Sequence, residues 1–404
     1  GYSVSLSAGS TGTVSAPTTQ STGYNGTVSF TVTPASGYQN VLETNTCGGT
    51  LSGNTYTISK VTSNKSCSIG FKKAQTLLSK LLSDNPTIST RNDFSAPFTT
   101  NTANTLYKAS ENATDVYYFA GQDTTSTPIN NWVKFGKNSS NQDLYWRIIR
   151  TNADGSIRLL YHGTSTTATD AYIGESAFNT NDDSPKYVGY MYGDSDTTLE
   201  DARTNTNDST IKTVIDNWYA SNMTSYTKYL STTAVYCNDR ELASGATYSA
   251  TGSEFYYAAY TRIDTDTPPT YDCTNDNDKF TVDASTGNGK LTYPIGLMTV
   301  DEVAYAGAGS VSEHEAEMWY YTNSSLESST GTTYWWSLSP YWSGRGNRSW
   351  SVSGSGYPGA LFHEHVITLH GVRPAVSLKS CIKYSTGNGT SETPYEIVET
   401  SSGC

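Results

Sequence analysis

The sequence predicts a β-rich and loop-rich protein in two parts, a small all-β domain followed by a large domain of the α+β class. Residues 1–71 alternate apolar and polar side chains with period two, which is typical of short strands. Residues 72–85 change to helical spacing. From residue 90 onward, short strand patterns and one clear helix pattern are separated by long segments rich in Tyr, Asn and Thr, which indicates mixed structure with many loops.

Composition restricts the class of protein. The chain has 404 residues, 15% charged side chains, 31 Tyr and a net charge of −12. The aromatic content is too high for a disordered chain, and a nucleic-acid partner is not expected because no Lys/Arg cluster exceeds two residues. No run of apolar residues is long enough to span a bilayer, and no signal peptide is visible. We therefore expect an extracellular, cell-surface or virion protein that would reach a membrane only through a missing anchor or signal segment.

The first two segments are assigned by periodicity. Residues 1–71 carry the strand patterns "GTVSFTVTPASGY" and "NTYTISKVTSNKSCSIGF", and this length fits a short immunoglobulin-like sandwich. Residues 72–89 are predicted to contain a linker helix, because leucines recur at helical spacing from Leu77 to Leu82 before Pro86 stops the run. A helix lying on a membrane surface is the alternative, although the segment is short and has few basic residues.

The remaining residues, 90–404, are predicted to form one large domain. The stretch 143–163 reads as a hairpin around Asp154-Gly155, a favoured turn dipeptide. Residues 207–222 read as a helix that Asp208 or Ser209 can cap and that has one apolar face. Residues 220–330 show few periodic signals and are expected to be mostly loop, whereas 334–378 return to short strands.

The six cysteines form three local pairs separated by roughly 20 to 36 residues, and none is a C-x-x-C. This pattern favours disulfides in an oxidising compartment. Six buried free thiols are the alternative that spacing alone leaves open. The expected pairs are Cys47 with Cys67, Cys237 with Cys273, and Cys381 with Cys404.

The segment "YWWSLSPYWSGRGNRSWSVSGSGYPGALFHEHVITLHGVRPAVSL" resembles the closing part of a C-type-lectin-like fold, in the branch shared with formylglycine-generating enzymes. It looks like a variable protein of a diversity-generating retroelement. The pair Trp146-Arg147, the helix ending "DNWY" and the motif "CNDR" at 237–240 extend the resemblance over residues 90–404. Positions that match the framework of such proteins are Trp335, Trp336, Trp350, Val352, Gly371, Arg373 and Pro374.

The resemblance implies ligand binding rather than catalysis, with a retroelement rewriting codons in a variable region at about 341–370. The expected partner is a protein or glycan on another cell or host surface. Aromatic, Arg and small polar residues suit such a surface because they combine contact area with adaptable hydrogen bonds. Alternation on a strand would place Leu361, His363 and His365 on one face. Trp335 and Trp350 are expected in the core, the commoner fate of aromatic side chains, whereas Trp342 and Phe362 are expected to be exposed, with burial as the alternative. The expected variable positions are Tyr341, Trp342, Ser343, Arg345, Asn347, Arg348, Tyr357, Pro358, Leu361, Phe362, His363, His365 and His370.

Metal binding is the rival interpretation of the histidines. His363 and His365 could offer two nitrogens to zinc, with His370 as a third ligand if the chain curls back, but the spacing is not H-E-x-x-H. We expect no cofactor. A structural calcium is the exception that remains open, because "GDSDTTLEDARTNTNDS" and "DCTNDNDKF" supply carboxylates and amides without the spacing of a calcium loop. Solvated acidic loops are the alternative.

Catalytic motifs are weak. Formylglycine-generating activity is not expected, since every cysteine has a plausible disulfide partner and no free reactive pair is evident. The chain has neither a phosphate loop nor a G-x-S-x-G elbow. The cluster Glu313, His314, Glu315 and Glu317 offers the two carboxylates of a glycosidase without showing their geometry, and a solvated charged turn is the favoured interpretation. The alternatives to a diversified binding protein are therefore an enzyme on the same fold, metal-dependent or not, and an undiversified structural surface protein.

Overall fold

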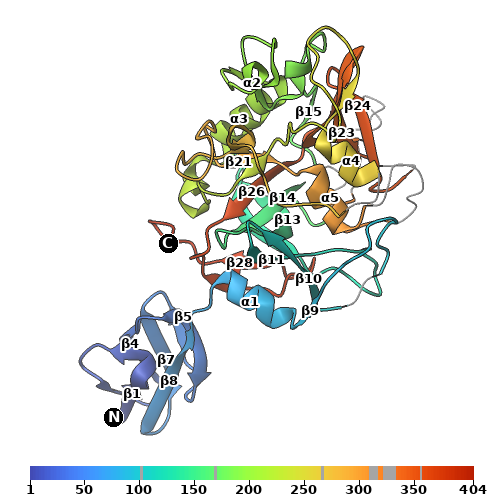
Figure 1. Ribbon diagram of the computed structural model, residues 1–404. Helices are drawn as coiled ribbons and strands as arrows, with labels where there is room; N and C mark the ends of the chain where they lie inside the picture. Colours follow the sequence, from blue (N-terminus) through green and yellow to red (C-terminus); the bar gives the residue numbers. More distant parts are fainter. Residues whose placement is uncertain (101–102, 168–170, 265–267, 309–316, 322–333, 355–356) are drawn as a thin grey trace. The chain divides into compact units, whose positions relative to one another are not determined.

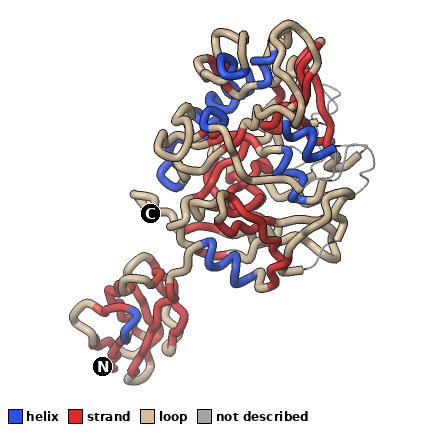
Figure 2. Tube along the Cα trace, in the orientation of Figure 1, coloured by secondary structure: helices blue, strands red, loops and turns tan. Residues whose placement is uncertain are grey.

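The computed structural model describes residues 1–100, 103–167, 171–264, 268–308, 317–321, 334–354 and 357–404 (Figure 1). The chain divides into two compact units, Gly1–Thr76 and Leu77–Cys404. The division falls inside the segment 72–89 that was predicted to link two domains. The protein is a mixture of helix and strand in which strand and loop predominate (Figure 2).

The first unit consists of two four-stranded sheets, with strand orders β3-β1-β8-β5 and β2-β4-β7-β6. Strands β1 and β8 are parallel, and the other pairs are antiparallel. Both sheets contribute to one apolar core, which includes Val4, Phe30, Tyr56 and Phe71. The strands are β1 (Tyr2–Ser7), β2 (Gly12–Val14), β3 (Thr19–Thr22), β4 (Gly26–Pro34), β5 (Tyr38–Asn45), β6 (Thr50–Ser52), β7 (Thr55–Val61) and β8 (Lys65–Lys73).

The segment predicted as a linker helix forms α1 (Leu77–Asp84), which belongs to the second unit. Leu77 and Leu81 are buried in the core of that unit, and Lys80 pairs with Asp84 at 2.6 Å. The leucine stripe is therefore covered by protein. None of the helices in the described residues has the length and apolar character needed to cross a membrane.

The second unit is built on an eight-stranded sheet of order β21-β26-β14-β13-β11-β10-β9, with β12 also paired to β13, as counted over the described residues. Strands β13 and β14 form the predicted hairpin, and Gly155 adopts a positive φ of 79° in its turn. The strands are β9 (Thr87–Ser89), β10 (Thr105–Glu111), β11 (Thr114–Tyr118), β12 (Trp132–Lys137), β13 (Asp143–Thr151), β14 (Ile157–Gly163), β21 (Ile295–Leu297) and β26 (Pro374–Leu378).

A second sheet has the order β15-β25-β22-β23-β24, with β19 paired to β22. Its side chains and those of the larger sheet contribute to one continuous core. The strands are β15 (Glu175–Ser176), β19 (Phe255–Tyr256), β22 (Trp335–Gly344), β23 (Gly346–Val352), β24 (Leu361–His365) and β25 (His370–Gly371).

The predicted helix at 207–222 is α3 (Thr210–Asn222), and Ser209 caps it by accepting a hydrogen bond from the backbone of Lys212. Its buried face contains Ile211, Ile215 and Tyr219. The segment expected to be loop contains further short elements. The remaining helices and strands are α2 (Leu199–Ala202), α4 (Ala258–Asp264), α5 (Val300–Ala306), β16 (Met191–Tyr192), β17 (Asn207–Asp208), β18 (Tyr236–Cys237), β20 (Lys279–Phe280), β27 (Tyr384–Thr386) and β28 (Glu396–Ile397).

The three expected disulfides are present, joining Cys47 to Cys67, Cys237 to Cys273, and Cys381 to Cys404. No cysteine is free. The alternative of buried free thiols is therefore wrong.

Candidate ligand-binding surface

The region with the lectin-like resemblance forms three adjacent antiparallel strands, β22, β23 and β24. The register places Leu361 opposite Val352, His363 opposite Trp350 and His365 opposite Arg348. Residues directly opposite in an antiparallel pair share a face of the sheet. The alternating residues of β24 therefore lie on one face, and that face runs from the buried core at Leu361 to a partly exposed rim at His365.

All seven expected framework residues are buried. Trp336 donates its indole N–H to the carbonyl of Ser176 at 2.9 Å, which ties β22 to β15. Gly371 lies against the ring of Tyr172, where an added Cβ would approach to 2.7 Å. These contacts explain why large aromatic side chains and one glycine are needed at these positions. The buried framework residues are Trp335, Trp336, Trp350, Val352, Gly371, Arg373 and Pro374.

Arg373 anchors the end of the framework. Its guanidinium donates to the backbone carbonyls of Tyr161 and Tyr320 and lies 5.2 Å from the ring of Trp335. Burial lowers the pKa of Arg373 to about 9. The residue is therefore a packing element that fastens the start of β26 to β14.

Nine of the thirteen expected variable residues are at least partly exposed. Their side chains extend along the rim of the three strands and the loop before β24. Tyr357 is 47% exposed. The partly or fully exposed positions are Tyr341, Trp342, Arg345, Arg348, Tyr357, Pro358, Phe362, His363 and His365.

The other four expected variable residues are buried, so their assignment to a ligand-facing surface is wrong for this conformation. Ser343 exchanges a hydrogen bond with the Tyr257 hydroxyl at 3.0 Å, and Asn347 donates to the carbonyl of Asp182. Leu361 packs in the core. His370 lies against the ring of Trp336 with the centroids 4.5 Å apart. The buried positions are Ser343, Asn347, Leu361 and His370.

Two stacked pairs of rings stabilise the exposed rim. Tyr341 stacks on His363 with centroids 3.8 Å apart and planes inclined by 6°. Tyr256 stacks on Tyr260 at 3.9 Å, and Tyr341 contacts both of these rings edge-on. Burial, followed by the neighbouring tyrosines, raises the pKa of Tyr341 to about 12. Tyr256 on β19 and Tyr260 on α4 were not predicted for this site, because nothing in the local sequence indicates their contact with β22.

Arg348 links the two histidines of β24. Its two terminal nitrogens lie 3.1 Å from Nδ1 of His363 and 3.0 Å from Nε2 of His365. A guanidinium only donates hydrogen bonds, so both imidazole nitrogens must accept. Burial, reinforced by the charge of Arg348, lowers the pKa of His363 to about 4. The imidazole of His363 is therefore neutral at pH 7 and carries its proton on Nε2.

This arrangement does not support the three-histidine metal site. His363 and His365 face Arg348, whereas Nδ1 of His370 donates to the carbonyl of Leu369 at 2.9 Å, away from the other two. Over the described ranges, no group of three or more His, Cys, Asp or Glu side chains is placed to hold a metal ion. His363 and His365 therefore contact the guanidinium of Arg348, whereas His370 packs against the ring of Trp336.

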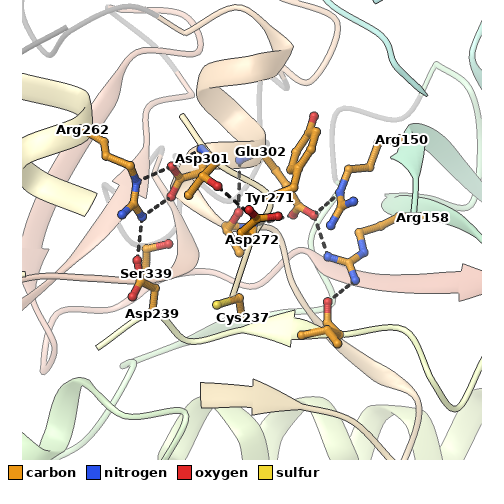
Figure 3. Close-up of a pocket in the computed structure, with 13 residues that line it drawn as sticks. Arg150, Arg158, Cys237, Asp239, Arg262, Tyr271, Asp272, Asp301, Glu302 and Ser339 are labelled. Carbon is orange, nitrogen blue, oxygen red and sulfur yellow. Dashed lines mark hydrogen bonds and ion pairs between the residues drawn. The ribbon is translucent and has the colours of Figure 1, made fainter. Parts of the chain in front are cut away.

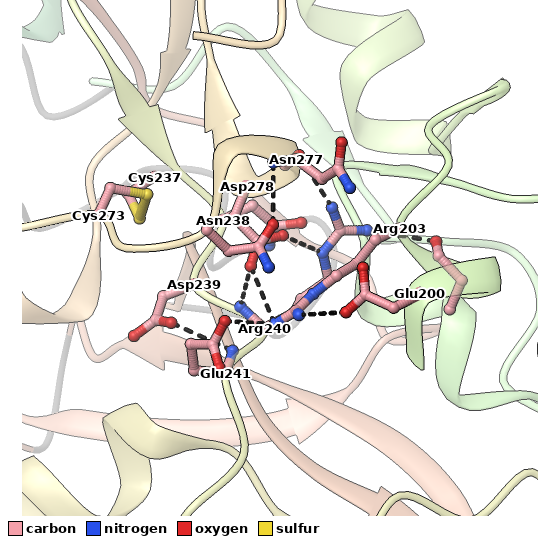
Figure 4. Close-up of polar contacts among 12 residues, drawn as sticks. Glu200, Arg203, Cys237, Asn238, Asp239, Arg240, Glu241, Cys273, Asn277 and Asp278 are labelled. Atoms are coloured by element: carbon pink, nitrogen blue, oxygen red, sulfur yellow. Dashed lines mark hydrogen bonds and ion pairs between the residues drawn. A yellow bond between two sulfur atoms is a disulfide. The ribbon is translucent and has the colours of Figure 1, made fainter. Parts of the chain in front are cut away.

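In the acidic loops considered for calcium, carboxylates are bound by backbone N–H groups and basic side chains of the protein itself. Asp201 completes the capping box of α2, and Asp276 pairs with Lys279 at 2.7 Å. Asp278 binds Arg240 at 2.6 Å and Arg203 at 3.3 Å in a buried network (Figure 4). These loops are therefore held by internal ion pairs and helix caps.

The motif "CNDR" is structural at each position. Cys237 forms a disulfide, and Asn238 donates to the carbonyl of Leu338 on β22 at 2.8 Å (Figure 4). Asp239 accepts from Arg262 at 2.7 Å, and Arg240 reaches the network of Asp278. The motif is therefore joined to β22 through the hydrogen bond between Asn238 and Leu338, and its other side chains bind protein partners.

A small cavity of about 20 Å³ lined by charged side chains lies between β13, β14 and α5 (Figure 3). Glu302 accepts from Arg150 at 2.9 Å and from Arg158 at 2.6 Å. Burial alone would raise the pKa of Glu302, but the two guanidinium groups lower it overall. The cavity has room for about one water molecule, so this cluster joins the elements of the core without space for a substrate.

The acidic cluster considered as a glycosidase pair is only partly described. Glu313, His314 and Glu315 lie outside the described residues, and Glu317 is exposed. The glycosidase interpretation therefore gains no geometric support.

Comparisons of this chain with protein-family models, curated proteins and solved structures found no match. The functional interpretation therefore depends on the residues and their arrangement.

Proposed function

We propose that this protein is displayed outside the cell, on a cell surface or virion, and binds ligands through the rim of β22, β23 and β24. The lectin-like fold, the immunoglobulin-like class of the first unit and diversification by a retroelement belong to this proposal. The three disulfides support an oxidising environment. The expected ligand is a protein or glycan on another surface.

One observation carries the proposal. The three strands place large rigid side chains on the partly exposed rim, while the framework residues beside them are buried. Tyr341, Trp342 and Arg348 belong to the residue types that dominate binding energy at interfaces. The stacking of Tyr341 on His363 holds the Tyr341 ring in place before any ligand arrives, which lowers the entropic cost of binding.

The test is to sequence the locus across a population of the source organism or virus. We expect codon differences to concentrate at the nine exposed positions and to match adenines in a template copy near a reverse transcriptase gene. The codons of the seven framework residues should be constant, and so should those of Ser343, Asn347, Leu361 and His370. A window 341–370 that is as constant as the rest of the chain would rule out diversification.

A further inference from the structure

We propose that the second unit has another binding site, a polar groove beside β12, β27 and β28 that accepts an uncharged oligosaccharide. Three surface cavities of about 480, 720 and 640 Å³ occur in this region. The first two share Thr166, Ser391 and Glu392, and the second and third share Lys134 and Glu396. The shared lining residues show that the three cavities are neighbours on one surface, which we call the groove, and each cavity has the volume of an ordinary ligand site.

The floor of the groove is fixed by backbone hydrogen bonds. Tyr395 donates to the carbonyl of Trp132 at 2.9 Å, and Lys134 donates to the carbonyl of Tyr395 at 2.9 Å. The loop between β27 and β28 is held by the side chain of Asn388, which accepts from Thr390 at 2.9 Å and also from Thr393. The groove is therefore preformed, so a ligand would not need to order the loop on binding.

The charges of the groove exclude an anionic ligand. Lys134 pairs with Glu396 at 2.8 Å, and Lys137 pairs with Asp143 at 2.6 Å. The third lysine of the groove, Lys80, is paired within α1. By contrast, the exposed carboxylate of Glu392 has no ion-pair partner among the described residues. A phosphate, sulfate or uronic acid would meet this carboxylate and find every lysine already neutralised.

The lining suits a ligand rich in hydroxyl groups. Thr166 and Ser391 have hydroxyl groups that can both donate and accept hydrogen bonds, whereas Asn388 has only its amide N–H groups for a ligand because its oxygen holds the loop. The amide oxygen of Asn130 is buried at the edge of the groove and has no hydrogen-bond partner within the described part of the chain. The half-buried ring of Tyr145 adds an aromatic surface to the central cavity. Sugars match this combination because they present hydroxyl groups at their edges and C–H groups on the faces that stack on aromatic rings.

The test is calorimetric titration of the full chain with four uncharged hexasaccharides, namely maltohexaose, cellohexaose, mannohexaose and chitohexaose, and with heparin hexasaccharide as the charged comparison. At least one uncharged probe should bind saturably, and Glu392→Lys and Tyr145→Ala should each weaken it by tenfold or more. Glu392 is on an exposed loop, so its variant is expected to fold even if the Tyr145 variant does not. Trp342→Ala tests the rim of β22–β24 as the other possible location of the sugar. The matched control is Tyr24→Ala, an exposed aromatic residue of the first unit, which should leave binding unchanged.

Three outcomes would overturn the proposal. They are no saturable binding of any uncharged probe, binding of the heparin probe alone, and binding that Trp342→Ala abolishes while Glu392→Lys leaves it intact. The last outcome would place the sugar on the rim of β22–β24 and would therefore support that surface instead. The groove does not depend on the proposed diversified surface, so either site can fail without the other.

Discussion

Replacing His370 by Phe should remove part of the acid sensitivity of the second unit. His370 is 2% exposed, and burial lowers its pKa to about 4, with only a small opposing effect from its hydrogen bond to Leu369. In the unfolded chain its imidazole titrates near pH 6.5. Between these two values the unfolded state binds more protons than the folded state, so the free energy of unfolding falls as the pH falls.

The magnitude follows from the two pKa values. A difference of about 2.5 pH units corresponds to at most about 3.4 kcal/mol, and about 2.4 kcal/mol of this is lost between about pH 7 and about pH 4.5. His363 and His162 also have lowered pKa values and add to the same slope. The effect of His370 is therefore the difference between the wild type and His370→Phe, because the other two histidines are common to both.

The assay is urea unfolding followed by tryptophan fluorescence at several pH values. All eight tryptophans lie in the second unit, so the signal reports that unit alone. The wild type should lose about 2 kcal/mol more than His370→Phe on acidification over this range. The two proteins could differ at pH 7 because Phe is larger, and only the difference in slope is diagnostic. Parallel pH profiles would refute the reasoning.

Three further substitutions test the buried and exposed faces separately. Leu361→Ala should destabilise the second unit by about 2–5 kcal/mol in urea unfolding, since the residue is fully buried, and a change below about 0.5 kcal/mol would contradict its core position. Glu302→Gln should lower the free energy of unfolding by about 3–5 kcal/mol in the same assay, because Arg158 loses its carboxylate partner and Arg150 loses one of its two carboxylate partners. An unchanged urea midpoint would argue against the network. Trp342→Ala should change stability by less than about 1 kcal/mol, measured by circular dichroism, and a larger loss would place this half-buried ring in the core.

Local patterns predicted the elements that have one buried face and one exposed face. The helix α3 has such a face and a serine cap, and the β13–β14 hairpin has a Gly that tolerates positive φ. The helix α5 was missed because every one of its residues is buried, so no amphipathic stripe exists. Asp301 and Glu302 make this segment look solvated, and only their distant arginine partners explain the burial.

The candidate surface was predictable only in part. Alternation identified the face that Leu361, His363 and His365 share, but it carries no information about how burial changes along a strand. Leu361 is buried because Val352 lies opposite it in the core, and His370 is buried because β25 lies inside the sheet. Likewise, Tyr256 and Tyr260 reach the surface through the pairing of β19 with β22, a contact between segments about 80 residues apart in sequence.

The division of the β22–β24 sheet into buried framework and exposed rim has a consequence for evolvability. Foldability rests on Trp335, Trp336 and Trp350, which are fully buried, whereas Arg345 and Tyr357 of the rim are exposed. Replacements at these exposed positions therefore draw little on the narrow margin of stability that limits most substitutions. Specificity can change at this rim over many steps while the scaffold that presents it stays the same.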